Sequence, residues 1–323
     1  MSVNQLVPIL TADGVQSSMS LESIADAIKM EFNTLYQQIM AASDPDFDLA
    51  DIATITMANN GTGIYGFLGD VPAIKDWVGS KTYGQMKKYD YKIENVEKYT
   101  GLAFGKKELR QSGLINLPIR VRQMVEAIMF DKKEALVEAL INGDTNKAYD
   151  GVAFFSNASG LRTNDNLLAG TGVTLAQISA DIISVKTAAG KFESDEGRKL
   201  RIRPMTVVCP LALEDKFLQI KESTTDASQS NSAVVKGAGK YIDKVIADPL
   251  LDEDDANDWY MLDTRKAVKP IILQGELMNN GQDVETVEDV TKWASDGILG
   301  VSVEASYATG YGHPATAVKV VNG

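Results

Sequence analysis

Cysteine and histidine are nearly absent from this sequence. Its 323 residues include one cysteine, Cys209, and one histidine, His313. One cysteine cannot form an internal disulfide, and a zinc site with several cysteine and histidine ligands cannot be built from one residue of each. We therefore predict no zinc site and no redox chemistry, and we assign no cofactor.

Long apolar runs are missing as well. No stretch approaches the roughly 18 to 20 apolar residues that cross a bilayer, and the first residues lack the basic and then apolar order of a secretory signal. The 44 acidic and 32 basic side chains leave a net charge of -12, which would repel phosphate backbones. These features predict a soluble, cytoplasmically made protein without sequence-specific nucleic-acid binding or a membrane partner.

A glycine-rich segment at residues 61–66 has the spacing of a dinucleotide-binding loop, with glycines at its first, third and sixth positions. That motif also needs a helix to begin at once, so that the N-terminal amides of the helix meet a pyrophosphate. Gly69 and Pro72 interrupt any such helix. We interpret the segment as flexible chain that links the first sixty residues to the body of the protein.

Two acidic groups have some features of cation sites. Asp44, Asp46 and Asp48 are spaced like the start of a calcium loop, but Leu49 stands where that loop needs glycine. The five acidic residues between positions 252 and 258 are a denser group. Such groups are most often solvated loops, and a weak cation site there stays an open alternative. We assign no metal ligand.

Cys209 and His313 could pair as a nucleophile and its base. Cys209, however, follows the apolar run 205–208 and precedes Pro210, which indicates the end of a buried strand. An activated thiolate needs an open, electropositive setting that nothing nearby supplies. We predict no catalytic residue and no enzyme.

A helix is predicted over residues 21–40, because apolar residues recur there at spacings of three and four. A helix that precedes any sheet has no local partner for its apolar face. We therefore expect an arm that docks on a neighbouring copy of the chain; the alternative is an ordinary helix that packs on its own core. The predicted contact residues are Leu21, Ile24, Ile28, Phe32, Leu35 and Ile39.

Period-two alternation before residue 93 and a second extended run over 96–104 predict a charged hairpin with its turn at Glu94 and Asn95. A two-stranded hairpin is only marginally stable alone. We expect this one to project and to be held by another subunit; the alternative is a hairpin packed on its own domain. The predicted contact residues are Lys87, Lys88, Tyr89, Tyr91, Lys92, Lys98, Lys106 and Lys107.

The longest predicted helix covers residues 117–141, with Pro118 in its first turn and Asn142-Gly143 at its end. Further helices are predicted at 175–189 and 211–220. Strands are predicted at 205–209, 241–247, 259–262, 268–273 and 300–307, and a polar loop at 223–239. The fold class is α+β.

Several segments resemble, in order and spacing, the major head subunits of Mu-like phages. They are Asp76-Trp77-Val78-Gly79, Tyr91-Lys92-Ile93-Glu94-Asn95, Leu140-Ile141-Asn142-Gly143 and the run from Tyr149 to Phe155. Residues 305–312 echo the family's last strand more faintly. The resemblance implies the Hong Kong ninety-seven type of tailed-phage capsid fold.

That fold assigns each predicted element to a part of a capsid subunit. The expected divisions are an N-terminal arm with its helix (1–60), a linker into the peripheral domain (61–80), an extended β-hairpin loop (81–113), a peripheral domain with its spine helix (114–166), an axial domain (167–277), and a return to the peripheral domain with the C-terminal strand (278–323).

The resemblance also implies a function. Copies would assemble as hexamers and pentamers into an icosahedral virion shell around double-stranded DNA, inside the host bacterial cytoplasm. Portal and decoration proteins are expected partners. Because the chain starts at Met1, we expect no removed pro-segment and hence a separate scaffolding protein. Alternatives are an encapsulin-like compartment shell around protein cargo, and a two-lobed soluble enzyme.

Overall fold

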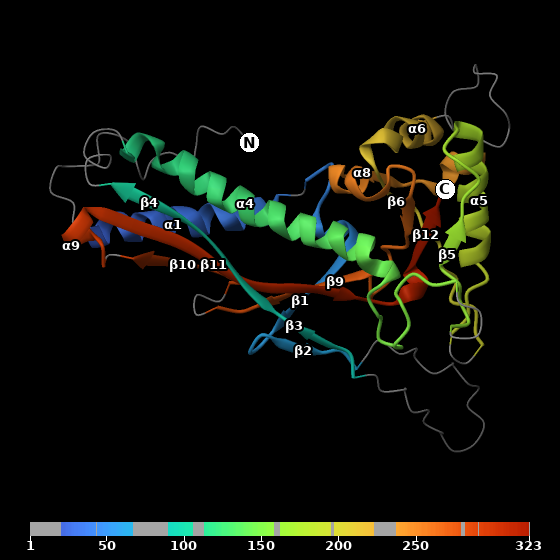
Figure 1. The fold of residues 1–323 in the computed structure, drawn as a ribbon, viewed down its shortest axis with the longest axis horizontal. Coiled ribbons are helices and arrows are strands. Elements are labelled where there is room, and N and C mark those ends of the chain that lie inside the picture. The colour runs from blue at the N-terminus through green and yellow to red at the C-terminus, as the bar shows by residue number, and fades with distance from the viewer. Residues whose placement is uncertain are drawn as a thin grey trace.

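The protein consists of two lobes joined side by side along its longest axis (Figure 1). The computed structural model describes residues 21–42, 44–66, 90–105, 113–157, 162–194, 197–222, 237–278, 282–289 and 291–322. Helices and strands alternate without forming a repeated unit, and each lobe is built on a five-stranded sheet. This arrangement is the predicted α+β class.

The first sheet is organised around one long strand, β11 (Ile298–Tyr311). Its neighbours are β4 (Val96–Gly105) on one edge and, on the other, β9 (Ile271–Glu276) and β10 (Val284–Asp289), with β1 (Ala53–Ala58) beyond β9. Tyr307 pairs with Val96 and with Gly275, whereas Ala305 pairs with Lys98 and with Val284. Strands β9 and β10 therefore lie end to end along the same edge of β11.

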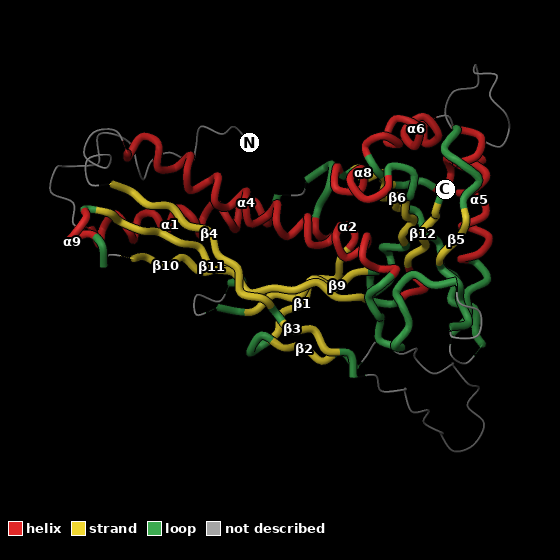
Figure 2. The backbone as a smooth tube through the Cα atoms, in the orientation of Figure 1, coloured by secondary structure: helices red, strands yellow, loops and turns green. Residues whose placement is uncertain are grey.

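Two helices cover one face of this sheet: α1 (Leu21–Ala41) and the long α4 (Gly113–Ile141) (Figure 2). Alternate residues of β11 face them, and Leu299, Val301 and Val303 are buried in one cluster with both helices. The short helix α2 (Leu49–Ile52) begins at Asp48, whose carboxylate caps it. None of the described helices is both long and apolar enough to span a bilayer.

The second sheet has the strand order β5 (Leu167–Ala169), β12 (Ala317–Val321), β8 (Trp259–Leu262), β6 (Thr206–Cys209) and β7 (Lys244–Ala247). Helices α5 (Leu175–Ala189), α6 (Leu211–Glu222) and α8 (Pro249–Asp255) accompany it. Helix α5 begins at a capping box between Thr174 and Gln177, and it has the predicted bounds.

The predicted hairpin is wrong. Strand β3 (Lys92–Glu94) pairs with β2 (Thr62–Ile64), and β4 instead pairs with β11 over ten residues. The longer ladder is favoured because it buries Phe104 and half-buries the alternate residues Lys98, Thr100 and Leu102, which a free ribbon would leave in water. Residues 81–89 and 106–112 of the predicted loop lie outside the described residues.

Three strands also correct the expected division into parts. Strand β1 lies within the predicted arm and β9 within the predicted axial segment, yet both belong to the first sheet. Strand β12, expected to return to the first lobe, lies in the middle of the second sheet. The apolar side chains of Val318 and Val320 are buried there against α5, α6 and Trp259. Most of the predicted polar loop, 223–236, lies outside the described residues.

Candidate functional site

The arm residues that the sequence assigned to subunit contacts fall into two groups. Ile28 and Phe32 are 1% exposed and pack within the chain's own core, between α4 and the first sheet. For these two residues the neighbour-contact prediction is wrong, and the alternative of a helix on its own core describes them. Leu35 and Ile39 are half-buried at the margin of that core. The side chains of Leu21 and Ile24 lie outside the described set.

Helix α1 is also held by a buried charge. The Lys132 ammonium on α4 donates to the carboxylate of Asp283 at 2.6 Å and to the Tyr36 hydroxyl of α1 at 2.8 Å. The same hydroxyl donates to Asp283 at 2.8 Å. Burial and the adjacent Asp283 carboxylate raise the pKa of Tyr36, so this phenol stays protonated and keeps donating. The three groups connect α1, α4 and the start of β10.

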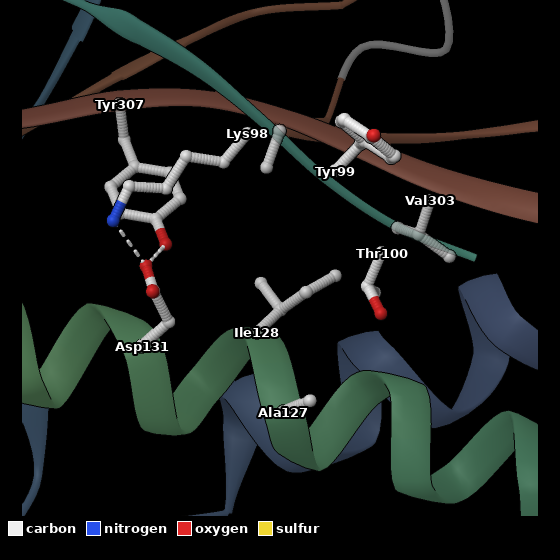
Figure 3. Close-up of a pocket in the computed structure, with 9 residues that line it drawn as sticks. Lys98, Tyr99, Thr100, Ala127, Ile128, Asp131, Val303 and Tyr307 are labelled. Carbon is white, nitrogen blue, oxygen red and sulfur yellow. Dashed lines mark hydrogen bonds and ion pairs between the residues drawn. The ribbon is translucent and has the colours of Figure 1, made fainter.

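A cavity of about 90 Å³ lies beside this network, between α4 and the strands β4 and β11 (Figure 3). Lys98 of β4 reaches across it and donates to Asp131 of α4 at 2.6 Å, and the Tyr307 hydroxyl of β11 donates to the same carboxylate. Thr100, Ile128 and Val303 line the remainder. The cavity is small, and its polar groups already satisfy one another.

The acid–base properties of this cluster fit a structural role. Burial alone would raise the pKa of Asp131, but hydrogen bonds from Lys98 and Tyr307 outweigh it and hold that pKa below its usual value. Burial, followed by the bond to Asp131, raises the pKa of Tyr307. Both groups therefore keep their ordinary charge states at neutral pH. The arrangement fastens the sheet to α4.

The predicted loop residues that the structure describes also have partners in their own chain. The Tyr91 hydroxyl accepts a hydrogen bond from the Tyr311 amide at 2.9 Å. Lys92 pairs with Glu94 on an exposed strand, and Lys98 lies in the cavity just described. Lys87, Lys88, Tyr89, Lys106 and Lys107 lie outside the described residues, so their contacts stay a prediction.

The rejected motifs have ordinary structural roles. Residues 62–64 of the glycine motif form strand β2, and residues 67–89 lie outside the described residues. Cys209 is fully buried, and burial raises the pKa of its thiol, which disfavours a thiolate. Asp252 accepts hydrogen bonds from the Leu211 and Ala212 amides and so caps α6. Within the described ranges, no group of three or more His, Cys, Asp or Glu side chains is placed to hold a metal ion.

Sequence reasoning missed the four residues that fasten the first lobe: Lys132, Asp283, Asp131 and Tyr307. One signal was available. Lys132 stands four residues after Ile128 and four before Leu136, on the apolar face of its helix. A lysine in that position must either extend to water or find a buried acid. Nothing in the sequence identified Asp283, 151 residues away, as that acid.

Solved structures of shell-forming proteins have a similar fold. The procapsid protein of bacteriophage JBD30 matches 93% of this chain and 75% of its own, with 16% identity and a TM-score of 0.51. The encapsulin SrpI of Synechococcus elongatus matches 89% of this chain and 94% of its own, with 9% identity and a TM-score of 0.51. At these identities the likeness establishes the fold.

The sequence establishes the family. Residues 25–179 and 244–322 match the family described as Mu-like prophage major head subunit gpT, and this chain belongs to that family. The matched segments include most of α1, all of α4 and strands of both sheets.

Two curated relatives agree with this assignment. The major capsid protein of Escherichia phage Mu is 30% identical over 105 residues, which are 32% of this chain and 34% of that protein. The Mu-like prophage FluMu major head subunit of Haemophilus influenzae is 21% identical over 179 residues, 55% of this chain and 54% of that protein. The chain thus spans about a third and about half of these relatives in the matched regions.

Proposed function

We propose that this chain is the major capsid protein of a tailed bacteriophage. Many copies assemble as hexamers and pentamers into an icosahedral shell that encloses packaged double-stranded DNA. The observation that carries the proposal is the family match, which extends over both lobes of a capsid-type fold. No step of this function requires catalysis or a cofactor.

The physical basis of assembly is burial and charge pairing between copies. Leu35 and Ile39 are half-buried on α1, and Tyr99 projects from β4 with 82% of its surface exposed. Apolar surface of this kind contributes about 25 cal/mol per Å² when a neighbour covers it, before the entropic cost of association is subtracted. Leu21 and Ile24 remain proposed arm contacts. A small free energy per contact is enough for a stable shell, because each contact is repeated around closed rings of subunits.

The net charge of -12 suits a DNA container. A negative wall repels the genome and keeps it from adhering during packaging and ejection. We place the protein in the virion, with assembly in the cytoplasm of the host bacterium. A separate scaffolding protein, a portal and a decoration protein are the proposed partners.

Expression of the chain followed by size-exclusion chromatography and electron microscopy tests this function. Megadalton particles or ring-shaped capsomers are the expected result. A compact monomer at every concentration, with and without scaffolding protein, contradicts it.

An encapsulin-like compartment shell is the second candidate, because SrpI shares the fold. The contents of particles purified from the native host separate the two. Nucleic acid inside supports a phage head, and enriched protein cargo inside supports a compartment.

The role of the predicted loop lysines has its own test. Changing Lys87, Lys88 and Lys92 to glutamate should weaken assembly, more at low salt than at high salt, because exposed charge pairs are screened. Assembly that is unchanged at low salt contradicts a role for these lysines in joining copies.

A further inference from the structure

One end of the second sheet carries a cluster of basic side chains. Between Gly197 and Pro204, four of six residues are basic: Arg198, Lys199, Arg201 and Arg203. Ile202 is buried and half-buried Leu200 packs beside it, which turns the arginines outward. Within the described part of the chain, the guanidinium groups of Arg198, Arg201 and Arg203 have no hydrogen-bond or ion-pair partner.

Contacts with the turn after strand β8 enlarge this cluster. The Arg265 guanidinium donates to the Arg203 carbonyl at 2.6 Å, and the Lys266 ammonium donates to the Leu200 carbonyl at 3.0 Å. Three of the described acids lie at this end, and one of them, Glu193, pairs with Lys199 at 2.5 Å. Asp263 is buried and paired with Arg265, and Asp243 is exposed. We name the arginines 198, 201, 203 and 265 with Lys266 the basic end. Among the described side chains at this end, six bases, with Lys199 counted, stand against three acids, in contrast to the acidic chain as a whole.

The opposite end of the same strands is acidic. Strand β6 runs from the basic end to Cys209, after which α6 begins, and Asp252 joins α8 to the first turn of α6. The first two turns of α6 and helix α8 together carry six acids and one base, Lys216. The acids, which we name the acidic end, are Glu214, Asp215, Asp252, Glu253, Asp254 and Asp255. Asp215, Glu253 and Asp254 are exposed.

These two ends lie about one strand length apart, roughly 13 Å for four residues. Figure 1 looks down the shortest axis of the molecule and shows the strands of the second sheet running across the view, with α6 and α8 at its upper margin. The acidic end, on α6 and α8, therefore lies at an edge of the molecule in this view, and the basic end lies at the opposite end of the same strands. Copies that lie flat in a shell wall meet through their edges.

We propose that the basic end of one copy docks on the acidic end of the next copy, head to tail, and that this contact closes the capsomer ring. The inference rests on the proposed function and names the surface through which it acts. A contact between two different surfaces of the same chain is heterologous, and it generates rings when the rotation closes. Each copy then uses both ends, so no charged edge stays unmatched in a complete ring.

Charge reversal in the full-length chain tests the contact. Variant A carries Arg198→Glu, Arg201→Glu and Arg203→Glu; variant B carries Asp215→Lys, Glu253→Lys and Asp254→Lys. In low salt, each variant should raise the concentration needed for half-maximal assembly by about tenfold or more, the product of three exposed charge pairs. The combined six-residue variant restores attraction and should assemble within about threefold of wild type.

A mixture of A and B gives the sharpest readout. A has two acidic ends and B has two basic ends, so they join only in alternation. Alternating rings close with even numbers of subunits, so electron microscopy should show hexameric rings without pentamers. A control variant reverses three exposed basic residues elsewhere, Arg122→Glu, Lys147→Glu and Lys292→Glu. It should assemble like wild type.

Each other outcome has a definite meaning. Wild-type chain that forms no particles contradicts the proposed function itself. If wild type assembles and variants A and B assemble equally well in low salt, the head-to-tail contact is wrong. Equal assembly with less nucleic acid in particles of A assigns the basic end to a polyanion and overturns the proposal. A control variant that fails like A also overturns it, since the effect is then one of general charge.

Discussion

Single residues in the first lobe connect elements that are distant in sequence. Lys132 is 1% exposed and touches both Tyr36 and Asp283, so one ammonium group bridges α1, α4 and β10. A buried ion pair of this kind need not exceed an apolar core in stability. Its value is specificity, because only one packing of the three elements satisfies all three groups.

Replacing Lys132 with methionine should lower the free energy of unfolding by about 3 to 5 kcal/mol, because it leaves the Asp283 carboxylate buried without a counter-charge. Adding Asp283→Leu should recover much of this loss. Lys92→Met is the matched control, since Lys92 and Glu94 form an exposed pair worth less than about 1 kcal/mol. Denaturant unfolding of unassembled subunits measures the unfolding free energies of the three variants. A loss for Lys132→Met no larger than that for Lys92→Met would contradict the bridging role of Lys132.

Asp131 gives a pH dependence of known sign. Its pKa is lowered in the folded chain, so its contribution to stability is present above the usual aspartate pKa of about 3.9 and is lost as pH falls through the lowered folded value. Asp131→Asn should therefore show a shallower loss of unfolding free energy below about pH 4 than wild type. Denaturant titrations at a series of pH values measure the slopes, and equal slopes would contradict the assignment.

Among the elements, α1 shows most clearly how structure changed a prediction. Its periodicity gave the helix and its apolar face, but periodicity cannot tell whether the partner of that face is the same chain or another. The structure packs Ile28 and Phe32 against α4 and the first sheet. The first effect of removing α1 therefore falls on the stability of the single subunit.

Phe32→Ala should destabilise unassembled subunits by about 3 to 5 kcal/mol, the usual cost of truncating a buried aromatic side chain. Met30→Ala, on the same helix with 59% of the residue exposed, should change stability by less than about 0.5 kcal/mol. Thermal or denaturant unfolding below the assembly concentration gives the comparison. If Phe32→Ala matched Met30→Ala there and impaired only assembly, the helix would dock on a neighbour after all.

The join between the two lobes depends on a close approach at Gly312. A Cβ atom at this position would lie 2.0 Å from the backbone oxygen of Lys269, an atom that cannot rotate away. Gly312→Ala should therefore cost about 1 to 3 kcal/mol. Gly105→Ala is the control, because no atom of the described residues lies within 4 Å of its added Cβ, and it should be close to neutral. Similar unfolding free energies for the two variants would show that the join is not tight.

Individual helices and strands could be predicted from the sequence, but several pairings between distant segments could not. Helix α5 and strand β8 have the predicted bounds because caps and apolar runs are local signals. The pairing of β4 with β11 joins residues about two hundred positions apart, so local alternation suggested the nearer partner. For the same reason, the local sequence pattern did not predict the Lys132–Asp283 ion pair or the hydrogen bond from Arg265 to the Arg203 carbonyl.

On the scale of the whole molecule, the chain passes between the lobes more than once. Strands β1 and β9 flank the second-lobe segments in sequence, yet they pair with each other in the first sheet. Strand β12 follows β11 directly but belongs to the second sheet. Because the chain crosses between the lobes several times, the two lobes form one structural unit. This suits a subunit that contacts neighbouring subunits at both of its ends.

Electron microscopy of the purified full-length chain, concentrated in low salt with and without scaffolding protein, is the most direct test of the proposed capsid function. Closed shells, or five- and six-membered rings of this subunit, are the expected result. A homogeneous population of monomers under all of these conditions would contradict it.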